Sequence, residues 1–135
     1  TTVDDVGRCI NPMIVHGQTH GGIAQGVGQA MWEECYVEPD SGQPLCGSFM
    51  DYGMPRAHTL PSFKTEIAEV HSPTNPLGIK AGGEGGTTPA MAVMVNGIVD
   101  ALKPYRIIDL QMPMTPLSIW KAIQAAEGGN ATEKG

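Results

Sequence analysis

Apolar residues recur at helical spacing in three stretches of the chain. The first predicts a long helix from Pro12 to about Glu34, and one stripe of it carries Ile23, Val27, Ala30 and Met31. The second, Pro89–Leu102, is apolar nearly all round, which predicts a helix buried on most faces. The third begins at Pro116 and is expected to end near Gly128-Gly129. Each predicted start has Asn or Thr followed by Pro, the pattern of an N-cap before the first helical residue, and the expected caps are Asn11, Thr88 and Thr115.

Shorter β-branched stretches predict strands between these helices. We expect strands at Thr2–Val6, Phe63–His71 and Arg106–Leu110, and a hairpin in which Tyr36-Val37 pairs with Leu45–Phe49 around a polar turn. Residues 51–61 contain two prolines and no clean period, which indicates an irregular connection. The pattern therefore predicts an α+β fold with a mixed sheet and about three helices.

Residues 72–88 show no regular element and contain a conspicuous glycine cluster. Two glycine pairs, Gly82-Gly83 and Gly85-Gly86, flank the single carboxylate Glu84. We expect this backbone to adopt positive φ and to approach a large ligand closely. Long irregular segments in compact domains are usually functional or disordered, so the alternative is a flexible surface loop with a solvated glutamate. A helix starting after Thr88 would direct its N-terminal N–H groups toward the loop and favour negative charge there.

The first predicted helix is unusually rich in glycine. Five glycines should together cost about 4–5 kcal/mol of helix propensity, so close packing against another element or a flat ligand must offset them. They are Gly17, Gly21, Gly22, Gly26 and Gly28. His16 and His20 have the i, i+4 spacing of metal ligands, but neither a third ligand nor an intervening base glutamate is evident. We therefore expect no metal held by these side chains.

Composition and charge narrow the functional classes. The 135 residues fit one domain, yet 18 glycines, 11 prolines and only seven aromatic residues (2 Trp, 3 Tyr, 2 Phe) suggest a piece that packs against a larger body. The net charge of −6, with no basic cluster, argues against nucleic-acid or anionic-membrane partners. The chain shows no membrane-length apolar run and no signal-peptide pattern at its first residues, so we expect a cytoplasmic protein. Cys9, Cys35 and Cys46 are odd in number and far apart, which argues against a disulfide framework, a zinc ribbon or an iron–sulfur cluster.

Five blocks in a fixed order give the chain a family resemblance that extends over nearly its whole length. They are residues 4–12, the glycine-rich segment 17–30, Asp51-Tyr52-Gly53-Met54-Pro55, the loop around Gly83-Glu84, and Met112-Pro113-Met114-Thr115-Pro116. Together they resemble the C-terminal part of the molybdenum-binding large subunit of the xanthine oxidase, aldehyde oxidase and aerobic carbon monoxide dehydrogenase family. The resemblance implies a sub-portion of a larger molybdopterin-binding domain, with residues 1–128 as the segment of that domain and residues 129–135 as a flexible tail.

The resemblance also implies roles for individual residues. Glu84 would be the base beside molybdenum in a water-poor pocket, for hydroxylation of an aldehyde or N-heterocycle with oxygen from water, or for oxidation of CO. Gln18, Gly82 and Gly83 would contact a molybdopterin-type cofactor, with its cytosine dinucleotide form as one alternative; for Gln18 the other reading is a helix-surface amide. Iron–sulfur centres and FAD would lie only on partner domains, in an oligomer with the remainder of the molybdenum subunit.

The chain departs from that family in length, because the family's subunits are several times longer and their other cofactor-contacting loops have no counterpart here. We therefore expect a fragment or split subunit that alone neither holds molybdenum nor turns over. Two other readings stay open: a non-catalytic accessory or assembly module of the same fold that acts through subunit contacts, and an autonomous small-anion binder at the start of the Pro89 helix. The substrate cannot be read from these residues.

Overall fold

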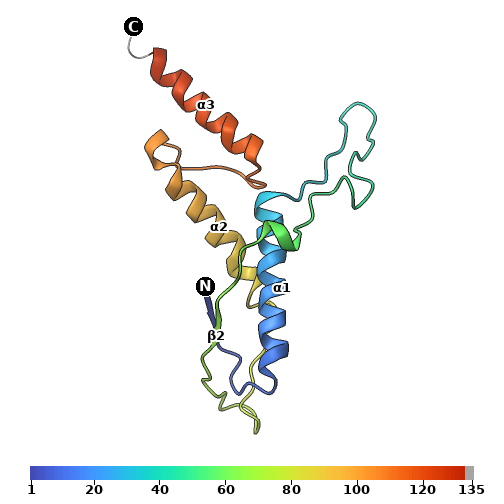
Figure 1. The fold of residues 1–135 in the computed structure, drawn as a ribbon, viewed down its shortest axis with the longest axis vertical. Helices are drawn as coiled ribbons and strands as arrows, with labels where there is room; N and C mark the ends of the chain where they lie inside the picture. Colours follow the sequence, from blue (N-terminus) through green and yellow to red (C-terminus); the bar gives the residue numbers. More distant parts are fainter. Residues whose placement is uncertain (133–135) are drawn as a thin grey trace. The chain divides into compact units, whose positions relative to one another are not determined.

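The computed structural model describes the backbone of residues 1–132 and the side chains of residues 1–128. Its helices are α1 (Pro12–Met31), α2 (Thr87–Ala101) and α3 (Pro116–Thr132), with the 3-10 turns η1 (Ala57–Thr59) and η2 (Lys103–Tyr105) (Figure 1). Its strands are β1 (Thr2–Asp4) and β2 (Thr65–Ile67). The chain divides into two compact units: unit 1 is Thr1–Gly26 with Arg56–Ala90, and unit 2 is Val27–Pro55 with Met91–Gly135.

Two of the three predicted helix caps are confirmed. The side-chain oxygen of Asn11 accepts a hydrogen bond from the Ile14 N–H (3.3 Å) at the start of α1. The Thr115 hydroxyl does the same for the Ser118 N–H (3.1 Å) at the start of α3. Both contacts satisfy a backbone donor that the first helical turn leaves without a partner.

The predicted cap at Thr88 is wrong, because α2 begins at Thr87, two residues before the predicted first helical residue Pro89, and therefore includes Thr88. The N–H groups of Thr87 and Thr88 both donate to the carbonyl oxygen of Glu84, each at 3.1 Å. The first turn of α2 therefore forms directly on the glycine-rich loop, and a Thr88 side-chain cap is not needed.

The helix ends also differ from expectation. Helix α1 ends at Met31 rather than near Glu34. Directly after Met31, the N–H groups of Trp32 and Glu33 both donate to the Gly28 carbonyl (2.9 Å each). Helix α3 continues past Gly128 to Thr132, so its predicted end is wrong; an established helix tolerates a glycine at a cost of about 1 kcal/mol. Of the tail expected at 129–135, the last three residues lie outside the described part of the chain.

The α+β class is confirmed, and the sheet among the described residues is a pair of parallel strands. Strand β1 lies beside β2 with Thr2 opposite Thr65 and Asp4 opposite Ile67 (Figure 1). The strand predicted at Arg106–Leu110 is wrong: Arg106 takes a left-handed conformation (φ 60°) that closes η2, and an irregular segment follows it.

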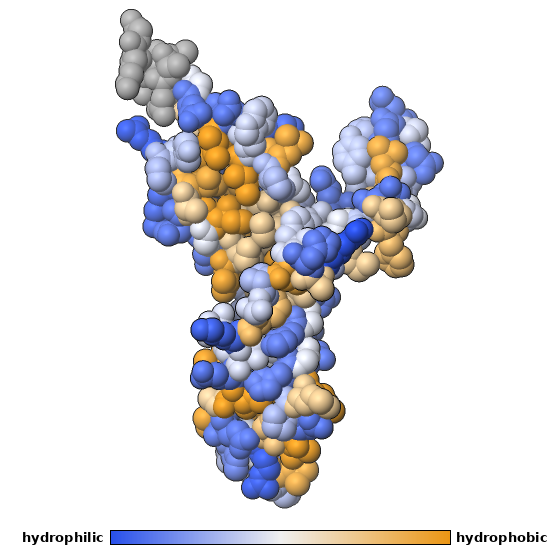
Figure 2. All heavy atoms as spheres, viewed as in Figure 1, coloured by the Kyte–Doolittle hydropathy of each residue, from blue (hydrophilic) through white to orange (hydrophobic). Residues whose placement is uncertain are grey.

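Helices α2 and α3 each expose much apolar surface, contrary to the expectation that Pro89–Leu102 is buried on most faces. Ala90 is the buried residue within α2, and Val93 is 65% exposed. On α3, Leu117 and Trp120 are each 57% exposed. Figure 2 shows hydrophobic side chains gathered on the surface of this part of the chain. The prediction failed because an apolar sequence indicates a need for burial, whereas burial itself requires covering elements that the described residues do not supply.

Small, tight contacts hold the rest of unit 2. The Met114 N–H donates to the Ala30 carbonyl (2.7 Å), and both residues are fully buried. A Cβ built on Gly28 would lie 2.3 Å from the Pro55 ring, and one on Gly53 would lie 2.5 Å from the Trp32 carbonyl. Gly28 is thus one helix glycine whose cost is offset by close packing against another segment, as predicted.

Candidate functional site

The glycine-rich loop of unit 1 is anchored to the N-terminal segment at its base. The Lys80 N–H donates to the Val6 carbonyl (2.8 Å), and the Arg8 N–H donates to the Gly78 carbonyl (2.9 Å). Gly7 lies at φ 66°, and a Cβ there would come within 2.2 Å of the Gly78 carbonyl, so this crossing requires glycine. The backbone at Gly78 and Lys80, from which the glycine-rich loop continues, is therefore held in a fixed position.

An ion pair reinforces this anchor. The Lys80 ammonium contacts the Asp5 carboxylate at 2.5 Å. The hydrogen bond from Lys80 is the largest cause that lowers the pKa of Asp5 to about 2, and the N–H groups of Gly7 and Val70 add to it. Asp5 and Lys80 were not paired from the sequence, because 75 positions separate them, although Asp5 lies in the first of the five blocks.

The far end of the loop packs directly on α1. A Cβ on Gly86 would lie 2.4 Å from the Thr19 carbonyl, and one on Gly22 would lie 2.9 Å from the Thr87 nitrogen. Loop and helix backbones thus touch at Gly22 and Gly86, which both have to be glycine. The expectation that the α1 glycines serve close packing holds here, and the partner is the start of α2.

The two glycine pairs around Glu84 do not use positive φ, so that prediction is wrong for them. Positive φ occurs at Gly7, Gly42 and Gly78, and not at the two pairs around Glu84. Gly82 is instead required by close approach, since a Cβ there would lie 2.7 Å from a Val6 methyl. Gly83 faces open space, with no atom within 4 Å of an added Cβ.

Gln18 joins α1 to this loop. Its side-chain N–H donates to the Gly83 carbonyl at 2.7 Å, and about two helical turns further along α1 the Gln25 side-chain oxygen accepts from the Thr87 hydroxyl (3.3 Å). Residues at these spacings share one side of a helix. We call this side the open face of α1; it consists of the exposed residues Gly17, Gln18, Gly21 and Gln25. An added Cβ on Gly17 or Gly21 would meet nothing within 4 Å, so backbone is accessible there.

Glu84 lies at the end of the loop with its carboxylate exposed. Among the described residues its side chain makes no hydrogen bond and no ion pair, while its carbonyl oxygen receives the first two N–H groups of α2. The backbone of Glu84 is therefore held in place and its carboxylate stays available. The water-poor pocket expected around it is not formed by the described residues. The structure places Gln18 beside Gly83, so all four predicted site residues, Gln18, Gly82, Gly83 and Glu84, lie together.

His16 and His20 serve a structural contact in unit 1. Nδ1 of His16 lies 2.7 Å and Nε2 of His20 lies 3.2 Å from the same Thr65 hydroxyl on β2. The His20 ring also meets Phe63 edge-on at 5.5 Å. Within residues 1–132 no group of three His, Cys, Asp or Glu side chains is placed to hold a metal. The i, i+4 histidine spacing is thus explained by docking of α1 on β2.

The exposed Glu84 carboxylate on its glycine-rich loop thus lies next to the open face of α1, and comparison with known proteins shows the family to which the chain belongs. Residues 1–61 match a family model described as a molybdopterin cofactor-binding domain. The chain is 41% identical over 127 residues to subunit gamma of the 6-hydroxypseudooxynicotine dehydrogenase complex of Paenarthrobacter nicotinovorans, covering 92% of this chain and 16% of that protein.

Two solved structures share the fold. Quinoline 2-oxidoreductase from Pseudomonas putida 86 superimposes with a TM-score of 0.84 at 40% identity, over 90% of this chain and 15% of that one. CO dehydrogenase from Oligotropha carboxidovorans gives a TM-score of 0.85 at 33% identity, over 93% and 15%.

The chain belongs to the family of molybdenum-binding large subunits that includes xanthine dehydrogenase, aldehyde oxidase and carbon monoxide dehydrogenase. It spans about one sixth of the length of these relatives. Among the described residues, no helix has both the length and the apolar character that a membrane crossing requires.

Proposed function

We propose that these residues form the C-terminal part of the catalytic subunit of a molybdenum-dependent hydroxylase, in which Glu84 is the base and Gln18 holds the cofactor. The observation that carries the proposal is the 2.7 Å hydrogen bond from Gln18 to the Gly83 carbonyl. This hydrogen bond holds the Gln18 side-chain amide, which would face the cofactor, beside Gly83, the residue directly before Glu84.

The residues present fit a large, flat, polar ligand. The hydrogen bond from Gln18 uses its N–H, so its carbonyl oxygen remains free to accept from a pterin edge. The open face of α1 presents bare backbone at Gly17 and Gly21, and Gly83 adds open space next to Gln18. Gly83 and Gln18 would therefore contact the cofactor, whereas Gly82 supports them through its contact with Val6.

The molybdopterin cofactor, when bound, supplies the redox chemistry of the hydroxylation. The chain's own contribution is proton transfer: the ionised Glu84 carboxylate accepts the proton that water-derived oxygen loses as it is transferred to the substrate. A positioned carboxylate base contributes about 10²–10⁴-fold in rate. Attachment of the Glu84 carbonyl to the first turn of α2 fixes the backbone from which the carboxylate reaches.

The wider setting follows the relatives and belongs to the same proposal. The remainder of the molybdenum subunit provides the other cofactor contacts, with iron–sulfur and flavin groups on partner domains of a cytoplasmic oligomer. The cofactor is of the molybdopterin type, and its cytosine dinucleotide form is one alternative. The substrate is an aldehyde, an N-heterocycle or CO.

The test is Glu84→Gln in the complete, assembled enzyme, with Glu127→Gln as the matched control. Both glutamates are exposed, and Glu127 lies on α3 in unit 2. We expect Glu84→Gln to lower kcat about 10²–10⁴-fold with normal molybdenum content and assembly, while Glu127→Gln leaves kcat unchanged. Unchanged turnover by Glu84→Gln at normal metal content would refute the base assignment.

A second candidate function is that of a non-catalytic module acting through subunit contacts. The exposed apolar side chains of α2 and α3, among them Val93, Leu117 and Trp120, favour it because such surfaces mark interaction sites. This candidate predicts that Glu84→Gln has no effect and that Trp120→Glu abolishes assembly. Loss of turnover by Glu84→Gln in a normally assembled complex would exclude it.

A further inference from the structure

Unit 2 contains a short antiparallel pairing that brings two cysteines together. The Leu45 N–H donates to the Tyr36 carbonyl (3.0 Å), the Glu38 N–H donates to the Gln43 carbonyl (2.9 Å), and Val37 bridges Pro44 between them. The chain reverses at Gly42, which lies at φ 71°. Continued by one residue, this register places Cys35 directly opposite Cys46.

The type of pair matters for the sulfur atoms. Tyr36/Leu45 is a hydrogen-bonded pair, so Cys35/Cys46 is a non-hydrogen-bonded pair, in which side chains lie closest together. The Cα separation of such pairs, about 4.5 Å, falls within the range that a disulfide accepts, about 4.4–6.8 Å. In agreement with this register, Cys46 is the main cause that raises the pKa of the Cys35 thiol. The Cys46 thiol also donates to the Glu34 carbonyl at 3.4 Å.

We propose that Cys35 and Cys46, which are free thiols in this structure, form a reversible cross-strand disulfide and are a redox-sensitive site of the protein. The sequence argued against disulfides because ten residues separate the two cysteines and a third is unmatched. The pairing of the two hairpin strands brings these cysteines close together in space although ten residues separate them in sequence. The inference concerns unit 2 and does not rest on the proposed function.

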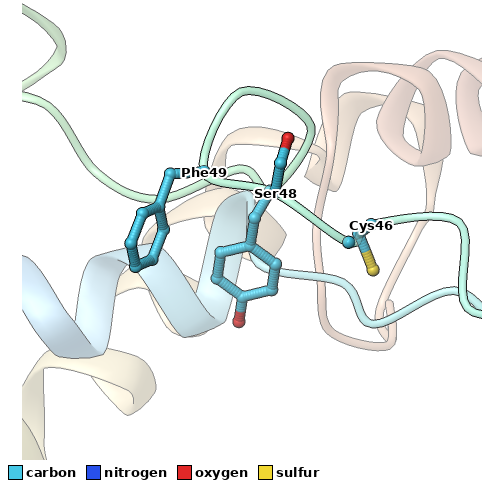
Figure 3. Close-up of a pocket in the computed structure, with 5 residues that line it drawn as sticks. Cys46, Ser48 and Phe49 are labelled. Atoms are coloured by element: carbon cyan, nitrogen blue, oxygen red, sulfur yellow. The ribbon is translucent and has the colours of Figure 1, made fainter.

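Both sulfurs can be reached by a small oxidant. Cys35 is exposed, and Cys46 lines an open pocket of about 390 Å³ together with Ser48 and Phe49 (Figure 3). The class of oxidant that we propose is a small-molecule disulfide, which has to reach only one of the two sulfur atoms. Oxidation would close the hairpin between its first and last residues and hold Cys46 at the pocket wall.

The exchange proceeds in two balanced steps. One cysteine thiolate attacks a sulfur of the small disulfide, forms a mixed disulfide and releases one small thiolate. The second cysteine then attacks the protein sulfur of the mixed disulfide, forms the Cys35–Cys46 bond and releases the other small thiolate. The two protein thiols lose two electrons to the reagent, and their protons pass to the two released thiols. The hydrogen bond with Cys46, followed by charge repulsion from Cys46 and by burial, raises the pKa of Cys35, so the reaction should accelerate as pH rises from 7 to 9.

The experiment treats the complete protein that carries these residues with oxidised glutathione, traps free thiols by alkylation and digests it with a protease that cleaves before aspartate. Asp40 is the one aspartate between the two cysteines, so cleavage there separates them unless a disulfide joins the fragments. We expect joined fragments in the wild type that separate with dithiothreitol. Cys9→Ser, the matched control, should keep the link, and Cys35→Ser and Cys46→Ser should each lose it.

A second measurement separates native geometry from the mere presence of two thiols. The equilibrium constant for disulfide formation against the glutathione couple should be at least about tenfold larger in the native protein than in urea. A ratio near one, a link that includes Cys9, or two alkylated thiols at Cys35 and Cys46 after treatment of the native protein would each overturn the proposal.

Discussion

Replacing Gly86 by alanine tests how the site is held together. The added Cβ would lie 2.4 Å from the Thr19 carbonyl and 3.0 Å from the Ile23 nitrogen, where ordinary contact begins at 3.4 Å. Both neighbours are backbone atoms of α1, so no flexible side chain can move aside. The loop must retreat by about 1 Å, and overpacking of this kind costs about 1–3 kcal/mol.

The retreat has two measurable effects. The amides of Thr87 and Thr88, which bond to the Glu84 carbonyl, should lose hydrogen-exchange protection by about 5- to 150-fold, the equivalent of that cost. If Glu84 is the base, turnover of the complete enzyme should fall on the order of 10²-fold, because a displacement of about 1 Å is enough to spoil a catalytic geometry.

Gly83→Ala is the matched control, since its Cβ would meet nothing within 4 Å. It should change the local stability by less than about 0.5 kcal/mol and leave the protection of the Thr87 and Thr88 amides intact. If Gly86→Ala also leaves that protection intact, loop and helix are not in the close contact described, and the reasoning fails.

Two further predictions concern unit 1 and the chain as a whole. The pKa of Asp5 is lowered to about 2 from 3.8, so its ion pair with Lys80 stabilises the fold fully above pH about 4, and this contribution is lost as pH falls from about 4 to about 2. Asp5→Asn should therefore flatten that part of the curve of stability against pH, measured in acid titrations followed by circular dichroism. An unchanged curve would contradict the assignment. The 135-residue polypeptide expressed alone should carry far less than one molybdenum per chain by elemental analysis and show no turnover; near-stoichiometric metal would refute the need for the remainder of the subunit.

The sequence by itself determined the features that depend on a few neighbouring residues. The Asn11-Pro12 and Thr115-Pro116 pairs set the starts of α1 and α3, since a cap needs only the first turn that follows it. The ordered motifs around Gln18 and Glu84 were enough to suggest the family, and the α+β class followed from the mixture of periods. The roles of Glu84 and Gln18 remain predictions.

Tertiary structure decided what depends on residues far apart in the chain. Thr88 does not take its predicted capping role because it lies inside α2, with its own N–H bonded to the Glu84 carbonyl. Gly82 is small because Val6 lies against it rather than because it needs positive φ. The fold places the rings of His16 and His20 within hydrogen-bond distance of the Thr65 hydroxyl, and it places Cys46 close to Cys35. The apolar residues of α2 show the limit most clearly: a sequence specifies which surface is costly to expose, but the position of other backbone segments decides whether that surface is covered.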